Sequence, residues 1–333
     1  MTAVIRPSTG AAYSKLLGVG GYRPKRIVTN EELCTWLDST DEWIRERSGI
    51  TERRWAGDDE TVVSMAVEAS RKALAHAGIA AEQIGAIVLG TITHPFQTPS
   101  AAAEVAYLLG ATNAGAFDTS AACAGFCYGI AIADGLIRNG TSEYVLNIGV
   151  EKLTDFIDKT DRGTGFIFAD GAGAVVMGPS AEPAIGPTIW GSDGSQRDVI
   201  IAEPDWVTLR REGGDWPVVK MQGQRVFRWA VGEMANVCRQ ALDAAGVSPE
   251  DLDVFIPHQA NMRITDAMIR SLHLPEHVVV ARDIALQGNT SAASIPLAMA
   301  RLYENNEVHS GQTALLVGFG AGLVYAAQVV TLP

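Results

Sequence analysis

Three polar residues, far apart in the sequence, have side chains that could carry out acyl transfer. Cys123 follows a turn of small residues in FDTSAACAGF, His258 stands in VFIPHQANMRI, and Asn289 stands in GNTSAASIPLAM. A cysteine is a nucleophile when it can ionise, and an imidazole and an amide can assist it. Taken singly, His258 also fits a structural histidine and Asn289 a helix N-cap. The three together on one apolar surface would indicate a catalytic site.

The position of Cys123 suggests how its thiol could be activated. In AFDTSAACAGFCYGIAIADGLI, Cys123 follows the small-residue turn and stands at the start of a helical pattern, so the thiol is expected at a helix N-terminus. Unpaired backbone N–H groups and the positive end of the helix dipole lower the pKa of a thiol there and favour the thiolate. The other cysteines, Cys34, Cys127 and Cys238, are interpreted as small buried residues.

An internal repeat indicates how these residues are positioned. Residues 71–88 align without a gap with residues 239–256 at a shift of 168, and EYVLNIG (143–149) aligns with QTALLVG (312–318) at a shift of 169. In the first pair, each copy begins as a helix that ends at a glycine, Gly78 or Gly246. A run of residues that favour β-strands follows the glycine. The pattern predicts two α/β halves, residues 1–180 and 181–333, each with a mainly parallel sheet, facing each other across a pseudo-twofold axis. The equivalent of Cys123 in the second half falls close to Asn289.

Composition excludes several classes of function. The chain has 333 residues with 26 basic and 38 acidic side chains, a net charge of −12, which argues against general binding to nucleic acid or to an anionic membrane. Four cysteines in a chain of this length do not form a disulfide framework, and the N-terminus lacks the apolar stretch of a signal peptide, so a cytoplasmic protein is expected. The uncharged residues 310–333 are interpreted as two buried strands around GFGAG and not as a membrane span.

Signatures of other enzyme classes are incomplete. GVGGYR and GFGAGL lack the third glycine of a dinucleotide fingerprint, and the sequence has neither a phosphate loop nor the H-E-x-x-H and G-x-S-x-G patterns. No cofactor and no metal are expected.

Several motifs, in this order, resemble one family. DEWIRERSGI, DTSAACAGF, DRGTGFIFADGAGAVV, VFIPHQANMRI, GNTSAASIPLAM and GFGAG are similar to those of β-ketoacyl-acyl carrier protein synthase III, the condensing enzyme that primes type II fatty-acid synthesis. The resemblance runs from about residue 14 to the C-terminus. It implies the thiolase fold, two βαβαβαββ halves in a five-layer αβαβα sandwich, and a homodimer.

The resemblance also implies the chemistry of the three polar residues. Cys123 would take an acyl group from acyl-CoA, with the backbone N–H groups of Cys123 and Ala321 forming an oxyanion hole. Malonyl-acyl carrier protein would then lose CO2, and His258 and Asn289 would hold the enolate that attacks the acyl-cysteine. Because decarboxylation supplies the carbanion, no catalytic carboxylate is expected at the site.

The substrate contacts implied by the resemblance form three groups. Trp43, Arg47 and Arg162 match CoA-binding residues, although from the sequence alone Trp43 would be a core residue and Arg47 a solvated charge. Arg228, Arg263 and Arg270 match a basic patch for the acidic carrier protein. Phe96 or Thr98, in THPFQTPSAA, matches the position in the family that closes the primer pocket of the partner subunit, and the sequence does not decide between them.

Alternative functions remain open at this point. A related enzyme could prime a polyketide or transfer acyl groups in secondary metabolism. Cys, His and Asn in this order also occur in papain-like hydrolases. A non-catalytic scaffold would be expected to have lost Cys123.

Overall fold

A computed structural model describes residues 4–333 and contains two five-stranded sheets. The first three residues of the predicted N-terminal half lie outside the described part. The first sheet has, in spatial order, the strands β5 (Gly115–Thr119), β4 (Ile84–Gly90), β6 (Tyr144–Lys152), β7 (Asp170–Ser180) and β1 (Tyr13–Tyr22).

The second sheet repeats the first. Its strands, in the corresponding order, are β12 (Val279–Val280), β11 (Val254–Pro257), β13 (Thr313–Gly320), β14 (Val324–Thr331) and β8 (Ile189–Ser192). Each strand of one sheet therefore has a counterpart at the same position in the other, as the internal repeat predicted. The domain boundary at residue 180 stays a prediction.

The prediction of mainly parallel sheets holds for four of the five strands in each half, and one strand of each sheet, β7 or β14, runs against the others. In the first sheet β4 pairs in parallel with β5 and β6, whereas β7 runs antiparallel to both β6 and β1. The second sheet follows the same rule, because β14 is antiparallel to β13 and to β8. The reason is that no α-helix connects β6 to β7 or β13 to β14: each pair is joined by a connection that returns the chain alongside itself.

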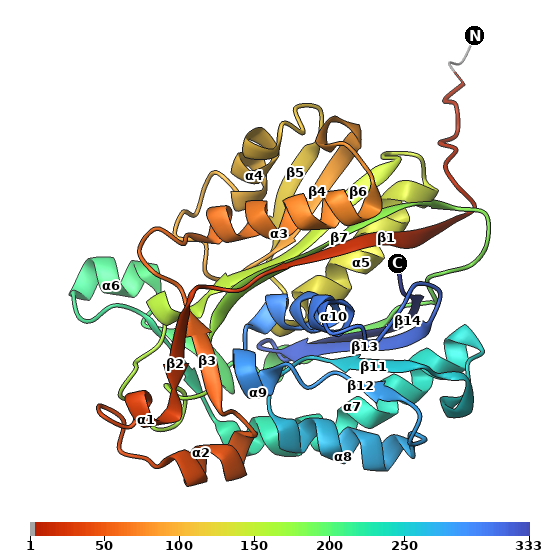
Figure 1. Ribbon diagram of the computed structural model, residues 1–333. Coiled ribbons are helices and arrows are strands. Elements are labelled where there is room, and N and C mark those ends of the chain that lie inside the picture. Colours follow the sequence, from red (N-terminus) through yellow and green to blue (C-terminus); the bar gives the residue numbers. More distant parts are fainter. Residues whose placement is uncertain (1–3) are drawn as a thin grey trace.

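Helices and sheets alternate in five layers (Figure 1). The outer face of the first sheet packs on α3 and α4, and that of the second sheet on α7 and α8. Two central helices, α5 and α10, lie between the sheets with one common apolar core. These helices are α3 (Val62–Ala77), α4 (Ala101–Leu109), α5 (Gly125–Arg138), α7 (Gly223–Ala245), α8 (Met262–Leu272) and α10 (Ser294–Glu304).

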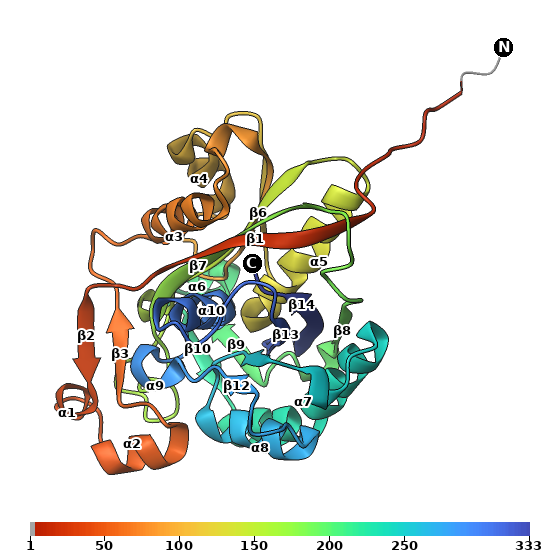
Figure 2. The same cartoon turned by 45° about the vertical axis from the view of Figure 1, so that its right-hand side comes forward.

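Smaller elements cover one end of the layers, beside the strand ends that carry the site (Figure 2). They surround a separate apolar cluster that includes Ile44, Trp55 and Phe166. The elements are β2 (Arg26–Thr29), α1 (Asn30–Leu33), α2 (Asp41–Ser48), β3 (Glu52–Trp55), β9 (Ile200–Glu203), α6 (Trp206–Glu212), β10 (Val218–Met221) and α9 (Ile284–Gln287). Short 3-10 turns are η1 (Ala81–Gln83), η2 (Ala122–Ala124), η3 (Leu153–Asp155), η4 (Gly194–Gln196), η5 (Pro249–Asp251) and η6 (Ser291–Ala293).

The local signals of the sequence end the repeated helices where expected. Gly78 ends α3 with φ of 65°, and Gly246 ends α7 with φ of 67°, a left-handed conformation that glycine adopts without steric cost. Residues 313–331 form β13 and β14, as the sequence predicted. Within residues 4–333 we find no helix with the length and apolar character needed to cross a bilayer.

Two glycines let the halves approach to backbone contact. A Cβ at Gly149 of β6 would lie 2.1 Å from the carbonyl oxygen of Ala292, in the 3-10 turn of the other half. A Cβ at Gly318 of β13 would lie 2.9 Å from the Cα of Ala124, in the turn that contains Cys123. Gly149 and Gly318 are the last residues of the repeated segments EYVLNIG and QTALLVG, so each half receives the turn of the other in the same way.

This close approach predicts that Gly149→Ala is destabilising. The added methyl group would meet backbone atoms, and overpacking of this kind costs about 1–3 kcal/mol. We expect a lower thermal midpoint by differential scanning calorimetry. Gly135→Ala in α5 is the matched control: nothing lies within 4 Å of its Cβ position, and alanine in a helix is worth about 0.5–1 kcal/mol over glycine. Equal midpoints for the two variants would contradict the account.

Candidate active site

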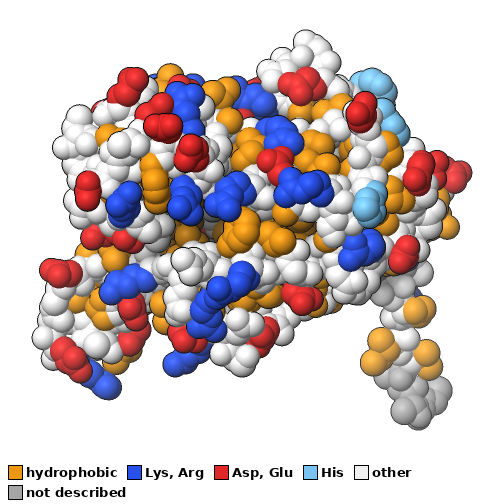
Figure 3. Space-filling view, turned by 90° about the horizontal axis from the view of Figure 1, so that it is seen from below, with side chains coloured by type: hydrophobic (Ala, Val, Ile, Leu, Met, Phe, Trp, Pro, Cys, Tyr) orange, Lys and Arg blue, Asp and Glu red, His pale blue; other side chains and the backbone are white. Residues whose placement is uncertain are grey.

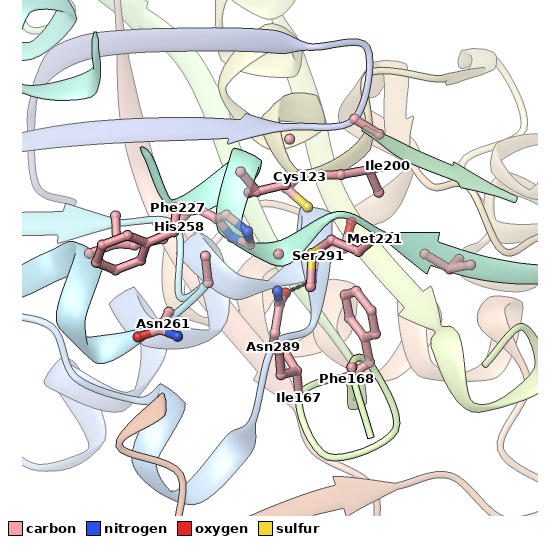
Figure 4. A pocket seen from close by; sticks show the side chains of 18 of the residues that line it. Cys123, Ile167, Phe168, Ile200, Met221, Phe227, His258, Asn261, Asn289 and Ser291 are labelled. Carbon is pink, nitrogen blue, oxygen red and sulfur yellow. Dashed lines mark hydrogen bonds between the residues drawn. The ribbon is translucent and has the colours of Figure 1, made fainter. Parts of the chain in front are cut away.

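A cavity of about 420 Å³ opens between the two halves, beside the covering elements. Its walls are largely apolar, with contributions from Phe166, Phe168 and Phe319. It brings together nine of the twelve residues that the sequence predicted for the site: Trp43, Arg47, Cys123, Arg162, Arg228, His258, Arg263, Asn289 and Ala321. Figure 4 shows the side chains of Cys123, His258 and Asn289 facing the same space.

Cys123 lies at the centre of η2, directly before α5. The preceding residue, Ala122, has φ of 43°, and its counterpart in the second half, Ser291, has φ of 48°. Such a left-handed conformation is strained for a residue with a side chain and turns the chain sharply into the helix. Gly320 leaves room for the nucleophile, because a Cβ there would lie 3.0 Å from the Cys123 sulfur.

The predicted activation of the thiol by the helix was wrong in direction. Burial raises the pKa of Cys123 to about 12, although the side chain keeps partial exposure through the cavity. A helix dipole contributes about 0.3–1 kcal/mol, which moves a pKa by less than about one unit. Loss of solvation around an ion in an apolar cavity is larger, so the resting group is a neutral thiol.

His258 follows β11, and its ring contacts Ser294. Burial lowers the pKa of the imidazole to about 3, so the ring is neutral. Its Nδ1 lies 2.7 Å from the hydroxyl oxygen of Ser294, and that oxygen already accepts a hydrogen bond from the backbone N–H of Gln259. The Ser294 hydroxyl can donate its proton to Nδ1, and in that arrangement the ring proton is on Nε2, the nitrogen available to the cavity.

Asn289 is buried, and hydrogen bonds fix both its backbone and its side chain. Its N–H donates to the carbonyl of Ile167 at 2.9 Å, and its own carbonyl accepts from Ala169 at 2.8 Å. The side-chain Oδ1 accepts a hydrogen bond from the backbone N–H of Ser291 at 2.8 Å. The amide therefore presents its Nδ2 donor to the cavity, and His258 and Asn289 each offer one hydrogen bond.

A buried carboxyl group, that of Glu151, lies behind the nucleophile and outside the cavity wall. Glu151 ends the apolar run of β6, and its Oε1 accepts a hydrogen bond from Ser291 at 3.1 Å. Its Oε2 accepts from the hydroxyls of Thr91 and Thr93 and from the N–H of Ile92. Burial raises the pKa of Glu151 to about 7. Glu151 could have been found from the sequence, because it is the one acidic residue in the apolar run YVLNIGVEK. Ser291 and Ser294 could also have been found, as polar residues in the small-residue turn GNTSAASIP.

Three residues form a cationic and aromatic group at the cavity. The guanidinium of Arg162 lies 4.7 Å from the ring centroid of Trp43, and that of Arg47 lies 5.7 Å from it. Phe166 supports Trp43 from below in an edge-to-face contact at 5.3 Å. This arrangement offers one flat ring and two positive charges, which suit a planar base and phosphate groups.

The predicted basic patch is divided between the cavity and the outer surface. Arg228 on α7 and Arg263 on α8 line the cavity, and Arg263 lies 4.9 Å over the ring of Phe227. Arg270, in the last turn of α8, is exposed and lies outside the cavity wall. Figure 3 views the molecule from the side of α7 and α8 and shows basic side chains across this face, with acidic ones between them.

Neither predicted primer-pocket residue lines the cavity of its own chain. Phe96 is 64% exposed and lines a second cavity of about 560 Å³, together with Phe156, Trp206 and Trp216. Thr98 is exposed and lines neither cavity. Ile92 of the same loop contributes to both cavities.

Comparisons with known proteins identify the family to which the sequence is similar. The family described as 3-oxoacyl-[acyl-carrier-protein] synthase III matches residues 117–194, and its C-terminal part matches residues 242–332. A β-ketoacyl-[acyl-carrier-protein] synthase III of Streptomyces coelicolor is 59% identical, and the alignment covers 99% of both chains.

Solved structures give the same result. The priming β-ketosynthase of the R1128 polyketide pathway is 47% identical with a TM-score of 0.96, covering 100% of this chain and 99% of the other. The 3-oxoacyl-[acyl-carrier-protein] synthase III of Aquifex aeolicus is 40% identical with a TM-score of 0.88, covering 96% of this chain and 100% of the other. With a thiolase-like duplicated fold and identity of this extent along the whole chain, the protein belongs to the β-ketoacyl-acyl carrier protein synthase III family, the acyltransferases that initiate fatty-acid synthesis.

Proposed function

We propose that Cys123, His258 and Asn289 carry out the two half-reactions of this condensing enzyme. The observation that supports the proposal most strongly is that one cavity holds a thiol and two fixed hydrogen-bond donors. In the first half-reaction the Cys123 sulfur attacks the thioester of an acyl-CoA, CoA leaves, and an acyl-cysteine forms. One thioester replaces another, so the bond energy changes little.

Backbone N–H groups stabilise the oxyanion of this first step. The N–H groups of Cys123 and Ala321 are the proposed donors, and both residues line the cavity. Ala321 follows Gly320, where an added Cβ would lie 3.0 Å from the Cys123 sulfur, so the turn after β13 lies next to the nucleophile.

In the second half-reaction the malonyl group of malonyl-acyl carrier protein loses CO2. Negative charge develops on its thioester oxygen, and the N–H donors of His258 and Asn289 stabilise that oxygen. A neutral imidazole with its proton on Nε2 suits this role, since it donates without having to be protonated first. The carbanion then attacks the acyl-cysteine, and 3-oxoacyl-acyl carrier protein is released.

Substrates enter along the basic side of the cavity. We assign the adenine ring of CoA to the face of Trp43 that the Arg162 guanidinium covers at 4.7 Å, so that Arg162 moves aside to admit the ring, with Arg47 near the phosphates. The acidic carrier protein docks on Arg228, Arg263 and Arg270, which give a protein of net charge −12 a local positive field. The described cysteines are free thiols, which supports a reducing, cytoplasmic setting.

A homodimer would complete the primer pocket. The edge strand β5 leaves Phe117 39% exposed, and the adjacent α4 exposes Tyr107 and Leu108. Unprotected apolar edges of this kind are interfaces in native proteins. We propose that β5 pairs with its copy, so that the loop with Phe96 and Thr98 closes the pocket of the partner.

A second candidate function is the priming of a polyketide. The specific observation in its favour is the likeness to the R1128 priming ketosynthase, which is as complete in coverage as that to the fatty-acid enzymes. The chemistry at Cys123 is the same in both, and the primer and the carrier protein differ. Membership of the condensing-enzyme family rules out the papain-like and the scaffold alternatives.

The proposed chemistry is tested by assaying the enzyme with malonyl-acyl carrier protein and a panel of acyl-CoA primers, with CoA, CO2 and 3-oxoacyl product measured separately. We expect all three in equal amounts. Asn289→Asp replaces the Nδ2 donor by a carboxylate oxygen, so CO2 release should fall about 100-fold or more while the first release of CoA persists. CoA release with no carbon–carbon bond formation by the natural enzyme would contradict the proposal, and a preference for a polyketide carrier protein would select the second candidate.

Carrier docking is tested at Arg270, which lies away from the cavity. Arg270→Glu should raise the apparent KM for malonyl-acyl carrier protein by roughly three- to tenfold, because the substitution reverses one charge of the docking field. Acylation by acyl-CoA should not change. Arg71→Glu, on α3 at the opposite face of the molecule, is the matched control (Figure 1). An equal effect of both variants, or a loss of acylation in Arg270→Glu, would refute this docking site.

Dimer formation is tested by sedimentation velocity. Phe117→Lys places a charge on the exposed edge of β5, and we expect it to convert a dimer into a monomer with little change in thermal stability of the monomer fold. Glu104→Lys, on the exposed surface of α4, serves as the control for added positive charge. A dimer that persists in Phe117→Lys would show that β5 does not form the interface.

A further inference from the structure

A chain of hydrogen-bonding groups leads from the nucleophile to the buried carboxyl. The hydroxyl of Ser291 donates to Glu151 Oε1 at 3.1 Å, and Ser291 lines the same cavity as Cys123 and acts to lower the pKa of the Cys123 thiol. Ser291 lines the cavity, whereas Glu151 does not, and Figure 4 shows Ser291 beside Asn289 on the floor below Cys123. The mechanism proposed above uses neither Ser291 nor Glu151.

The direction of hydrogen-bond donation along this series of groups determines whether the thiol or the thiolate of Cys123 is favoured. While Glu151 is ionised, the Ser291 proton points to Glu151, and only an oxygen lone pair is left for the sulfur. That lone pair can accept from a thiol but repels a thiolate. Once Glu151 is protonated, its own proton can point to Ser291 Oγ, and the Ser291 hydroxyl can turn to donate to a thiolate. Protonation of Glu151 therefore reverses the direction in which these groups donate hydrogen bonds.

The negative charge of Glu151 and the hydrogen-bond direction both disfavour the Cys123 thiolate. A second negative charge beside an ionised Glu151, in a site with little water, is strongly unfavourable, and the charge of Glu151 contributes to the raised pKa of Cys123. The pKa of Glu151 itself is raised to about 7, so this carboxyl takes up a proton in the physiological range. His258, with a pKa of about 3, is a poor acceptor for the thiol proton.

No cation neutralises Glu151 among the groups that the described residues place around it. Lys152 is next in sequence, but its Nζ donates to the carbonyl of Gly57 at 2.9 Å and lies 3.9 Å from Asp155. His94, on the loop after β4, packs its ring on Phe96. The donors to Glu151 are the neutral hydroxyl and N–H groups already named.

We propose that Glu151 is a positioning residue for the nucleophile: through Ser291 it shares one negative charge with Cys123, so that the thiol ionises as Glu151 takes up a proton. In this step the S–H bond of Cys123 breaks, the proton passes to Ser291 Oγ, the Ser291 hydroxyl proton passes to Glu151, and the pair keeps a net charge of minus one. After acyl transfer the departing CoA thiolate takes the stored proton by the reverse path. The inference rests on Cys123 as the nucleophile.

The test follows the rate of Cys123 alkylation by iodoacetamide as a function of pH, with each cysteine quantified by peptide mass spectrometry. Iodoacetamide reacts with the thiolate, so the profile reports ionisation without any condensation assay. A failure of the proposed function in the assay of CoA and CO2 is thus distinguishable from a failure here. Cys34, which is partly exposed on the covering elements, is the internal reference in every variant.

Glu151→Gln keeps the shape of the side chain and removes its charge. We expect the Cys123 profile to shift to lower pH by about one unit or more, because Glu151 and Cys123 compete for a single negative charge in the natural protein and the competing carboxylate is absent in the variant. Ser291→Ala breaks the chain and leaves the charge, so its profile should shift to higher pH. Asp170→Asn is the matched control, since Asp170 is another buried carboxyl, held by Thr154 at 2.6 Å and outside the cavity wall, and its profile should match the natural protein.

Two results would overturn the proposal. One is a Glu151→Gln profile that superimposes on that of the natural protein, and the other is a Ser291→Ala profile that shifts in the same direction as Glu151→Gln. Thermal unfolding of each variant establishes that it is folded. Should Glu151→Gln not fold, Ser291→Ala decides alone, and an unchanged or lowered profile for it would contradict the proposal.

Discussion

The structure depends on the contact between the 3-10 turn of each half and the central strand of the other half. Gly149 in β6 receives the turn at Ala292, and Gly318 in β13 receives the turn at Ala124, both at distances that exclude a side chain. Interiors are packed as densely as organic crystals, so a backbone seated in this way has little freedom. Cys123 and Ser291 belong to these two turns, and their relative position follows from a contact between backbones. The site is therefore built at the point where the duplicated fold closes on itself.

The same closure accounts for the electrostatics of the site. Two sheets and two central helices exclude water from the floor of the cavity, and burial keeps both the thiol of Cys123 and the imidazole of His258 neutral. A neutral imidazole and a neutral amide stabilise a developing oxyanion without moving a proton, which suits the decarboxylation. A neutral thiol is a poor nucleophile, and Glu151 is the nearby group whose charge can change in the physiological range. In the proposed mechanism, the low dielectric that favours decarboxylation disfavours ionisation of the thiol, and Glu151 is proposed to take up the thiol proton.

Much of the fold followed from the sequence because it is repeated. The shifts of 168 and 169 predicted two equivalent halves, and with them the placing of Cys123 and Asn289 at equivalent turns. The antiparallel β7 and β14 were missed because a buried strand has the same apolar pattern in either direction. The predicted lowering of the Cys123 pKa was also wrong, because the sequence shows where the helix begins but does not show how deeply the thiol is buried. Glu151 and Ser294 act through contacts between distant segments, for which no local pattern exists.

The most direct test of the central claim is peptide mapping of the enzyme after a single turnover with acyl-CoA, before malonyl-acyl carrier protein is added. The account predicts one acyl group per chain, attached as a thioester to Cys123, which disappears when malonyl-acyl carrier protein follows. An acyl group on Cys34, Cys127 or another residue, or condensation with no acyl group on Cys123, would contradict it.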